Sequence, residues 1–102
     1  MKKVIVRYRI KADQVGENQK LIAAVFSELK MARPEGLRYA SFLQQDGQSF
    51  VHVASIETPD GTNPLANLAT FKAFQKDLQS RCLEAPVATE ITEIGSYRVF
   101  SE

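Results

Sequence analysis

A tight turn between two strand-like runs is the feature that most constrains the fold of this sequence. Residues 37–45 and 48–57 are rich in aromatic and β-branched side chains, which favour extended strands. Asp46 and Gly47 separate the two runs, and this dipeptide suits the positive φ angles that a hairpin turn requires. The sequence therefore predicts an antiparallel hairpin near the middle of the chain.

The segment before the hairpin changes from a strand pattern to a helix pattern. Residues 3–11 alternate between two faces, one of which is clearly apolar, so they predict a strand. Asp13 is expected to cap a helix that ends at Pro34 and Gly36. This helix is amphipathic because its apolar side chains recur along one stripe, formed by Val15, Ile22, Val25, Phe26 and Leu29.

The segment after the hairpin predicts an interrupted helix. Asn63 and Pro64 fit a helix cap followed by proline at the first helical position. A single straight helix from there would point Leu65 and Phe74 in opposite directions. We therefore expect a short helical turn, a break, and a main helix that restarts near Thr70.

The main helix and a last strand complete the predicted elements. The helix carries one apolar stripe, formed by Phe71, Phe74, Leu78 and Cys82. We expect Pro86 to end this helix and residues 87–100 to form a long strand. Gly95 marks a bulge or bend within that strand.

These elements predict an α+β fold in which residues 1–102 form a single ferredoxin-like domain. The order β-α-β-β-α-β places both helices on one face of a four-stranded antiparallel sheet. The other face carries Ile5, Arg7 and Arg9 on the first strand, so it mixes apolar and charged side chains. A second copy of the chain would cover this face, which predicts a homodimer; a monomer with a solvated sheet face is the alternative.

Composition and charge limit the partners of the chain. The formal net charge is +1 and the signs alternate along the sequence, so we expect no nucleic-acid partner. Residues 21–26 are far shorter than the roughly 20 residues that span a bilayer, and Arg7 and Arg9 interrupt the N-terminal apolar run. We therefore expect no membrane segment and a cytoplasmic location. The only cysteine, Cys82, provides neither a disulfide nor a metal cluster, so no metal site is expected.

His52 is the natural candidate for a catalytic residue. It is the only histidine, and imidazole titrates near neutral pH, so it could act as a general base. Its strand face also carries Phe50, Ala54 and Ile56, so the alternative is a half-buried histidine that only packs and hydrogen-bonds.

The tyrosines and arginines on the strands have two interpretations as well. Tyr8 lies on the apolar face of the first strand, where its hydroxyl could bind a phenolic substrate or an anion, and Tyr39 and Tyr97 are similar candidates. Each could equally be a core tyrosine. The pair Arg7 and Arg9 could bind a carboxylate, but ion pairs with Glu90 or Glu93 are the more common outcome.

Three features make the chain similar to the antibiotic biosynthesis monooxygenase-like branch of the dimeric α+β barrel superfamily. They are the two-sided first strand, the strand Phe50-Val51-His52-Val53, and the helix stripe Phe71-x-x-Phe74-x-x-x-Leu78. The resemblance implies a homodimer with a pocket between sheet and helices. It further implies a cofactor-independent monooxygenase that acts on a small aromatic, quinol-like or polyketide-like molecule. On this basis the site would consist of His52 as catalytic residue with Tyr8, Tyr39, Phe74 and Gln75 as substrate-binding residues.

The sequence departs from the heme-degrading members that share this resemblance. Those members use a tryptophan and a histidine, whereas this chain has no tryptophan and carries Gln75 where the histidine would stand. Glutamine is a poor axial ligand for iron, so we expect no heme and no other cofactor. Two alternatives to the oxygenase remain: a non-catalytic ligand-binding or stress-associated dimer, and an isomerase or decarboxylase of a small acid.

Overall fold

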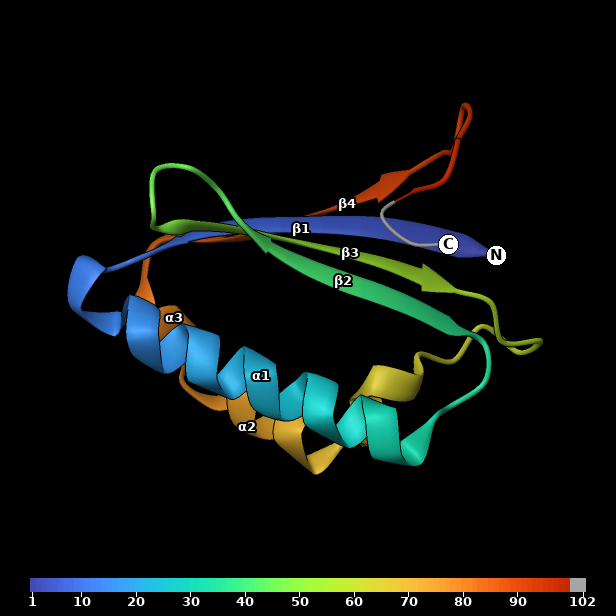
Figure 1. The fold of residues 1–102 in the computed structure, drawn as a ribbon, viewed down its shortest axis with the longest axis horizontal. Helices are drawn as coiled ribbons and strands as arrows, with labels where there is room; N and C mark the ends of the chain where they lie inside the picture. Colours follow the sequence, from blue (N-terminus) through green and yellow to red (C-terminus); the bar gives the residue numbers. More distant parts are fainter. Residues whose placement is uncertain (100–102) are drawn as a thin grey trace.

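The computed structural model describes residues 1–99 and shows one sheet packed against a layer of helices (Figure 1). The strands are β1 (Lys2–Ile10), β2 (Leu37–Leu43), β3 (Ser49–Ile56) and β4 (Cys82–Ile91). The helices are α1 (Val15–Ala32), α2 (Ala69–Lys76) and α3 (Leu78–Arg81), with short 3-10 turns η1 (Ala12–Gln14) and η2 (Pro64–Asn67).

The order of the strands in the sheet is β2-β3-β1-β4, and every neighbouring pair is antiparallel. The helices lie together on one side of the sheet, and the opposite face has no helix over it (Figure 1). This arrangement confirms the predicted α+β ferredoxin-like fold. It also places β2 and β4 at the two edges of the sheet.

Asp46 and Gly47 form the predicted turn between β2 and β3. Gly47 has a φ of 75°, which glycine adopts without the steric strain of a side chain. The Asp46 carboxylate accepts the backbone N–H groups of Gln48 and Ser49 at 2.9 and 2.8 Å. The turn fixes the register of the two strands, because a slip of one residue would exchange their two faces.

The boundaries of α1 differ at one end from the prediction. Asp13 does not cap the helix; it lies within η1, where Gln14 N–H already donates to the Lys11 carbonyl. The other end is as predicted: Arg33 closes the helix with its N–H on the Leu29 carbonyl, before Pro34. No helix within residues 1–99, α1 included, has the length and apolar character needed to span a bilayer.

The predicted break in the second helical region is confirmed. Asn63 caps η2, since its side-chain oxygen accepts the Leu65 N–H at 3.0 Å. Leu68 then adopts an extended conformation with φ of −84° and ψ of 129°, which separates η2 from α2. The break allows Leu65 and Phe74 to be buried in one core.

The prediction for the end of the second helical region was wrong. We expected Pro86 to end the helix, but the helical region ends at Arg81 and β4 begins at Cys82, so Pro86 lies inside a strand. This position is tolerated because β4 is an edge strand, where a missing N–H group need not break a ladder. Gly95 lies beyond the end of β4, and Phe100 lies outside the described residues.

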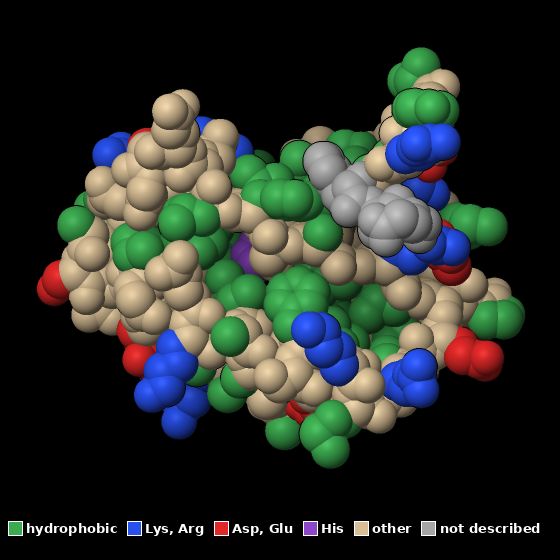
Figure 2. Space-filling view, in the orientation of Figure 1, with side chains coloured by type: hydrophobic (Ala, Val, Ile, Leu, Met, Phe, Trp, Pro, Cys, Tyr) green, Lys and Arg blue, Asp and Glu red, His purple; other side chains and the backbone are tan. Residues whose placement is uncertain are grey.

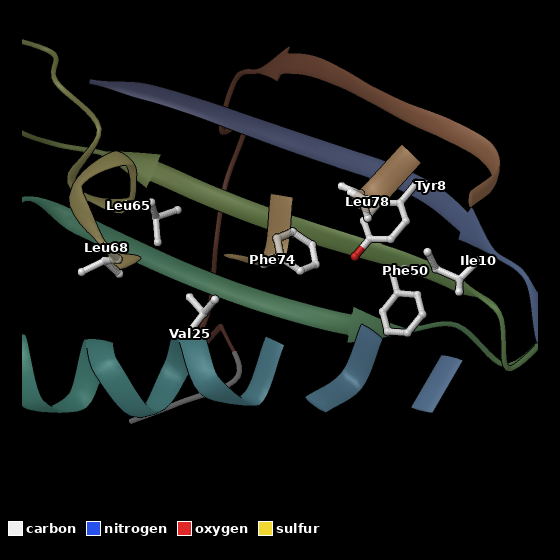
Figure 3. Packing of buried hydrophobic residues seen from close by; sticks show 8 residues of the cluster. All are labelled: Tyr8, Ile10, Val25, Phe50, Leu65, Leu68, Phe74 and Leu78. Atoms are coloured by element: carbon white, nitrogen blue, oxygen red, sulfur yellow. The ribbon is translucent and has the colours of Figure 1, made fainter. Parts of the chain in front are cut away.

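The hydrophobic core lies between the sheet and the helices (Figure 3). Its buried members come from both the sheet and the helices and are Tyr8, Ile10, Val25, Phe50, Leu65, Leu68, Phe74 and Leu78. Cys82 packs against this cluster from the start of β4 and is a free thiol. The predicted helix stripes therefore face the sheet.

Candidate functional site

The strand register brings polar side chains together on the helix-covered face of the sheet. Ser41 on β2 lies directly opposite His52 on β3, and His52 lies opposite Val6 on β1. Tyr8 lies two residues after Val6 on β1, and Tyr39 lies two residues before Ser41 on β2. Both tyrosines are therefore diagonal neighbours of His52. Three strands thus contribute side chains to one group around the imidazole.

Both ring nitrogens of His52 have hydrogen-bond partners. Its Nε2 lies 2.7 Å from the Tyr8 hydroxyl. Its Nδ1 lies 2.5 Å from Ser41 Oγ and 3.0 Å from the Tyr39 hydroxyl. The histidine is only 4% exposed, so these contacts satisfy a polar group inside the protein.

Two further buried residues extend this group to the helices. Asn18 on α1 is completely buried, and its amide nitrogen donates to the Tyr8 hydroxyl oxygen at 3.0 Å. Arg81 at the end of α3 donates from Nε to Asn18 Oδ1 at 3.1 Å. Its Nη2 donates to the Phe74 carbonyl at 2.8 Å, and the guanidinium lies over the Phe74 ring. We call Arg81, Asn18, Tyr8, His52, Ser41 and Tyr39 the buried polar chain.

Arg81 fixes the direction of the first hydrogen bonds in the buried polar chain. A guanidinium only donates, so the Asn18 oxygen must face Arg81 and the Asn18 nitrogen must donate to Tyr8. The Tyr8 oxygen is then an acceptor, and its hydrogen is left for His52 Nε2. This order of donors favours the neutral His52 tautomer that carries its proton on Nδ1.

The direction continues from His52 to the edge strand β2. In that tautomer the Nδ1–H group points to Ser41 Oγ and to the Tyr39 hydroxyl oxygen, which lie 2.5 and 3.0 Å away. His52 then offers no acceptor to the Tyr39 hydroxyl hydrogen. Since each bond polarises the next, the chain ends in a hydroxyl donor on Tyr39.

Burial keeps these groups in their neutral forms near neutral pH. Desolvation lowers the pKa of His52 to about 4, because a charged imidazolium is disfavoured away from water. Desolvation raises the pKa of Tyr8, against the effect of the hydrogen bond from Asn18. Desolvation also raises the pKa of Tyr39, against the effect of its hydrogen bond with Ser41. Both tyrosines therefore remain hydroxyl donors.

Stacked rings hold the buried polar chain in place. The Tyr8 ring stacks on Phe50 and on His52, with centroids 5.6 and 5.3 Å apart. The Tyr39 ring stacks on His52 from the other side at 5.9 Å and also on Phe26 of α1 at 5.3 Å. These offset contacts leave each hydroxyl little freedom to turn away from its partner.

Two cavities lie between α1 and β2, and the stacked pair of Phe26 and Tyr39 lines one of them. The first has a volume of about 230 Å³ and is lined by Tyr39 and Phe26, together with Leu29, Lys30, Arg33, Pro34 and Leu37. The second has a volume of about 250 Å³ and is lined by Ser41, together with Gln19, Ile22, Ala23, Phe42, Leu43 and Phe50. Figure 2 shows this side of the molecule, where a small part of the only histidine is visible between the helices and the sheet. The end of the buried polar chain therefore lies beside the cavities.

The structure brings four of the five predicted site residues together. His52, Tyr8 and Tyr39 share hydrogen bonds, and the Phe74 ring lies 5.6 Å from the His52 ring and 6.4 Å from the Tyr8 ring. Gln75 is exposed on α2 and is not part of this group. Tyr8 and His52 line neither of the two cavities.

The predicted pair Arg7 and Arg9 lies on the face of the sheet away from the helices. Arg7 donates to Gln44 at 3.1 Å, and Arg9 pairs with Glu84 at 3.9 Å instead of with Glu90 or Glu93. Glu93 pairs with Lys3. The arginines thus have neighbours of their own outside the cavities.

Asn18 and Arg81 are the members of the site that sequence reasoning missed. A signal for Asn18 is present, because it lies one helical turn before Ile22, on the predicted apolar stripe of α1. Arg81 is likewise seven residues after Phe74, in line with the stripe of the second helix. A polar side chain on an apolar stripe indicates a buried partner.

The fold resembles solved structures of the antibiotic biosynthesis monooxygenase type. A structure described as an antibiotic biosynthesis monooxygenase superposes with a TM-score of 0.72 at 16% identity, over 93% of this chain and 100% of that one. Rv0793 from Mycobacterium tuberculosis gives a TM-score of 0.75 at 14% identity, over 93% and 96% of the two chains. A variant of SnoaB, a cofactor-independent oxygenase from Streptomyces nogalater, gives 0.68 at 15% identity, over 93% and 94%.

These likenesses confirm the predicted resemblance at the level of the fold. The chain has the same fold as these solved structures, two of which are described as an antibiotic biosynthesis monooxygenase and a cofactor-independent oxygenase. No protein-family model and no curated protein matches the sequence. Sequence identities this low establish the architecture, and the function must be argued from the site.

The low pKa of His52 predicts a specific loss of stability in weak acid. An unfolded chain takes up a proton on this residue below its ordinary pKa of 6.5, whereas the folded chain does so only near pH 4. The unfolded state therefore binds more protons between these values, and the free energy of unfolding falls as the pH is lowered through them. The total loss from this residue is about 3 kcal/mol.

Urea unfolding at a series of pH values measures this effect. His52→Gln keeps a polar side chain but cannot titrate, so it is the matched comparison. We expect the wild type to lose more stability than this variant between about pH 6.5 and 4, while carboxylates affect both proteins alike. Equal losses in the two proteins would contradict a buried neutral histidine.

Proposed function

We propose that the chain binds a small aromatic hydroxy compound, a phenol or quinol, in the cavity beside Tyr39 and oxidises it with dioxygen as a cofactor-independent monooxygenase. The observation that carries this proposal is the direction of the buried polar chain, which leaves the Tyr39 hydroxyl as its terminal donor. Tyr39 and Phe26 also offer flat apolar surfaces to an aromatic ring.

The chemistry of such an oxidation requires an anionic substrate. A phenolate or quinolate, formed when the hydroxy compound loses its proton to water, can pass an electron to dioxygen, whereas the neutral compound does so poorly. One oxygen atom would then enter the substrate, which supplies two electrons and two protons, and the other would leave as water. A fixed donor that points at the developing oxyanion stabilises it more than water would, because the donor needs no reorientation. The Tyr39 hydroxyl would supply this hydrogen bond, with the positive charge of Arg81 at the other end of the chain.

The geometry favours a positioning role for His52 over the role of general base. In the favoured tautomer its proton lies on Nδ1, toward Ser41 and Tyr39, and the lone pair on Nε2 already accepts the hydrogen bond from Tyr8. A pKa of about 4 also makes it a weak proton acceptor near neutral pH. His52 would instead hold Ser41 and Tyr39 in place and polarise their hydroxyl groups.

The comparisons support the oxygenase by association. SnoaB is a cofactor-independent oxygenase with this fold, at 15% identity. The same fold hosts different activities, so this likeness raises the expectation without identifying a substrate.

A second candidate function is favoured by the close packing around the centre of the buried polar chain. Tyr8 and His52 are only 2% and 4% exposed, so no substrate would touch either side chain without a rearrangement. This packing suits a protein that binds a ligand in the cavities and performs no reaction. The two candidates differ in whether bound quinol is consumed.

Replacing the terminal donor tests the oxygenase directly. We expect purified wild-type protein to accelerate oxygen uptake with hydroquinone, and Tyr39→Phe to lower that rate about 100-fold while it keeps the aromatic ring. Tyr97→Phe is the matched control, because Tyr97 is an exposed tyrosine outside the site. An oxygen electrode measures the rates.

Two results would contradict the oxygenase. Uptake that is the same in Tyr39→Phe and in the wild type would exclude the proposed donor. Binding of hydroquinone without any uptake above that of buffer would leave the non-catalytic ligand-binding function.

We further propose that the uncovered face of the sheet forms a homodimer. A row of small and apolar side chains crosses the centre of this face, formed by Ala40, Val53, Ile5 and Thr89 on neighbouring strands. Arg9 has a buried Nε atom on the same face with no hydrogen-bond partner within residues 1–99. A second sheet packed here would bury the apolar row and offer an acceptor to Arg9.

Light scattering tests the homodimer. The wild type is expected to have twice the 11.4 kDa mass of one chain, and Val53→Asp is expected to have the mass of one chain because it would place a charge between the sheets. Gln79→Asp, on the exposed side of α3, is the control and should leave the mass unchanged. A wild-type mass of 11.4 kDa would contradict the proposal.

A further inference from the structure

The cavity beside Tyr39 has an aromatic end and a basic end. Phe26 on α1 and Arg33, the residue that caps the end of this helix, both line it; they are seven residues apart, which separates them by about 10 Å along the helix axis. Lys30 lines the cavity between them. Basic side chains also border the apolar lining on this side of the molecule in Figure 2.

The positive charges at the basic end are unbalanced by the protein. Within residues 1–99, neither Lys30 nor Arg33 forms an ion pair or a side-chain hydrogen bond, and no acidic residue lines the cavity. Other cations of the chain do find carboxylates, as Arg38 does with Glu57 at 3.3 Å. The cavity thus presents two free cations next to an apolar, aromatic surface.

The backbone at Arg33 gives a second indication. Its φ of 47° lies in the left-handed region, where glycine is the usual residue at a helix end and other residues are strained. Cations at a helix C-terminus also interact favourably with the helix dipole, and this effect would be enough to explain the presence of Lys30 in the last turn of α1. It does not explain why an arginine, and not a glycine, occupies the strained position beside the cavity.

We propose that this cavity binds a single-ring aromatic acid, with its carboxylate on Lys30 and Arg33 and its ring hydroxyl toward Tyr39. This inference rests on the proposed function, since it names the class of the hydroxy compound. The volume of about 230 Å³ suits one substituted ring, because cavities of about 150 Å³ hold benzene and drug-sized ligands need about 300 Å³ or more. Lysine and arginine are the side chains that bind carboxylates with charge-assisted hydrogen bonds.

Calorimetric titration without oxygen tests the inference with two probes. The probes are 2,5-dihydroxybenzoate and hydroquinone, which share the quinol and differ in the carboxylate. We expect the wild type to bind the acid about tenfold more tightly, and this preference to weaken as salt is added. The double variant K30Q/R33Q should lose the preference and keep its affinity for hydroquinone.

Two further variants separate ligand binding from an effect on the helix. Lys20→Gln removes an exposed lysine of the same helix away from the cavity and should keep the full preference. Arg33→Gly should bind the acid less tightly while its thermal midpoint stays the same or rises, because glycine relieves the strain. A fall in the midpoint of Arg33→Gly with an unchanged preference would show a structural role and overturn the inference.

The remaining outcomes distinguish this inference from the proposed function. Binding of the acid that depends on Lys30 and Arg33, without oxygen uptake, would support the inference and contradict the oxygenase. Oxygen uptake with hydroquinone, without any preference for the acid, would support the oxygenase and overturn the inference. Failure of both probes to bind would overturn the inference.

Discussion

The buried guanidinium of Arg81 is the constraint on which the rest of the site depends. Arg81 is only 5% exposed and can only donate hydrogen bonds, so its acceptors must be supplied by the fold. Asn18 supplies one, and the Phe74 carbonyl, in the last turn of α2 where carbonyls lack helical partners, supplies another. Loss of an acceptor would leave a buried guanidinium N–H group unsatisfied, which costs about 1–3 kcal/mol or more.

The hydrogen bonds that begin at Arg81 connect the helices with three of the four strands. From Arg81 the hydrogen bonds pass to α1 through Asn18, to β1 through Tyr8, to β3 through His52 and to β2 through Ser41 and Tyr39. The first steps are fixed by the guanidinium, and they favour one direction for the steps that follow. The buried polar chain therefore aligns the helices with the sheet and also sets what the cavity beside β2 can offer a ligand.

Local patterns in the sequence predicted the elements better than they predicted the site. The hairpin, the break near Leu68 and the order of strands and helices follow from nearby residues, and the structure confirms them. Equal steps backward from Asp46 and forward from Gly47 lead to Ser41 and His52. The position of the turn is therefore enough to predict that these two residues lie opposite each other. The prediction for Pro86 failed because nothing in the local pattern shows that its strand lies at an edge of the sheet.

The contact between Asn18 and Arg81 joins residues 63 positions apart, which no helical or strand periodicity relates. Each lies on an apolar stripe, but nothing in the sequence shows that the two stripes face each other across the core. The convergence of Tyr8 and Tyr39 on His52 likewise needed the pairing of β1 with β3, which the hairpin alone does not fix.

The ¹⁵N chemical shifts of the His52 ring at neutral pH test the direction of the buried polar chain most directly. The chain has one histidine, so its two ring nitrogens can be identified without ambiguity. We predict a neutral ring with the proton on Nδ1 and a bare Nε2 that accepts from Tyr8. A proton on Nε2 alone, or on both nitrogens, would contradict the account, because Tyr8 and Tyr39 would then not be arranged as donors along one direction.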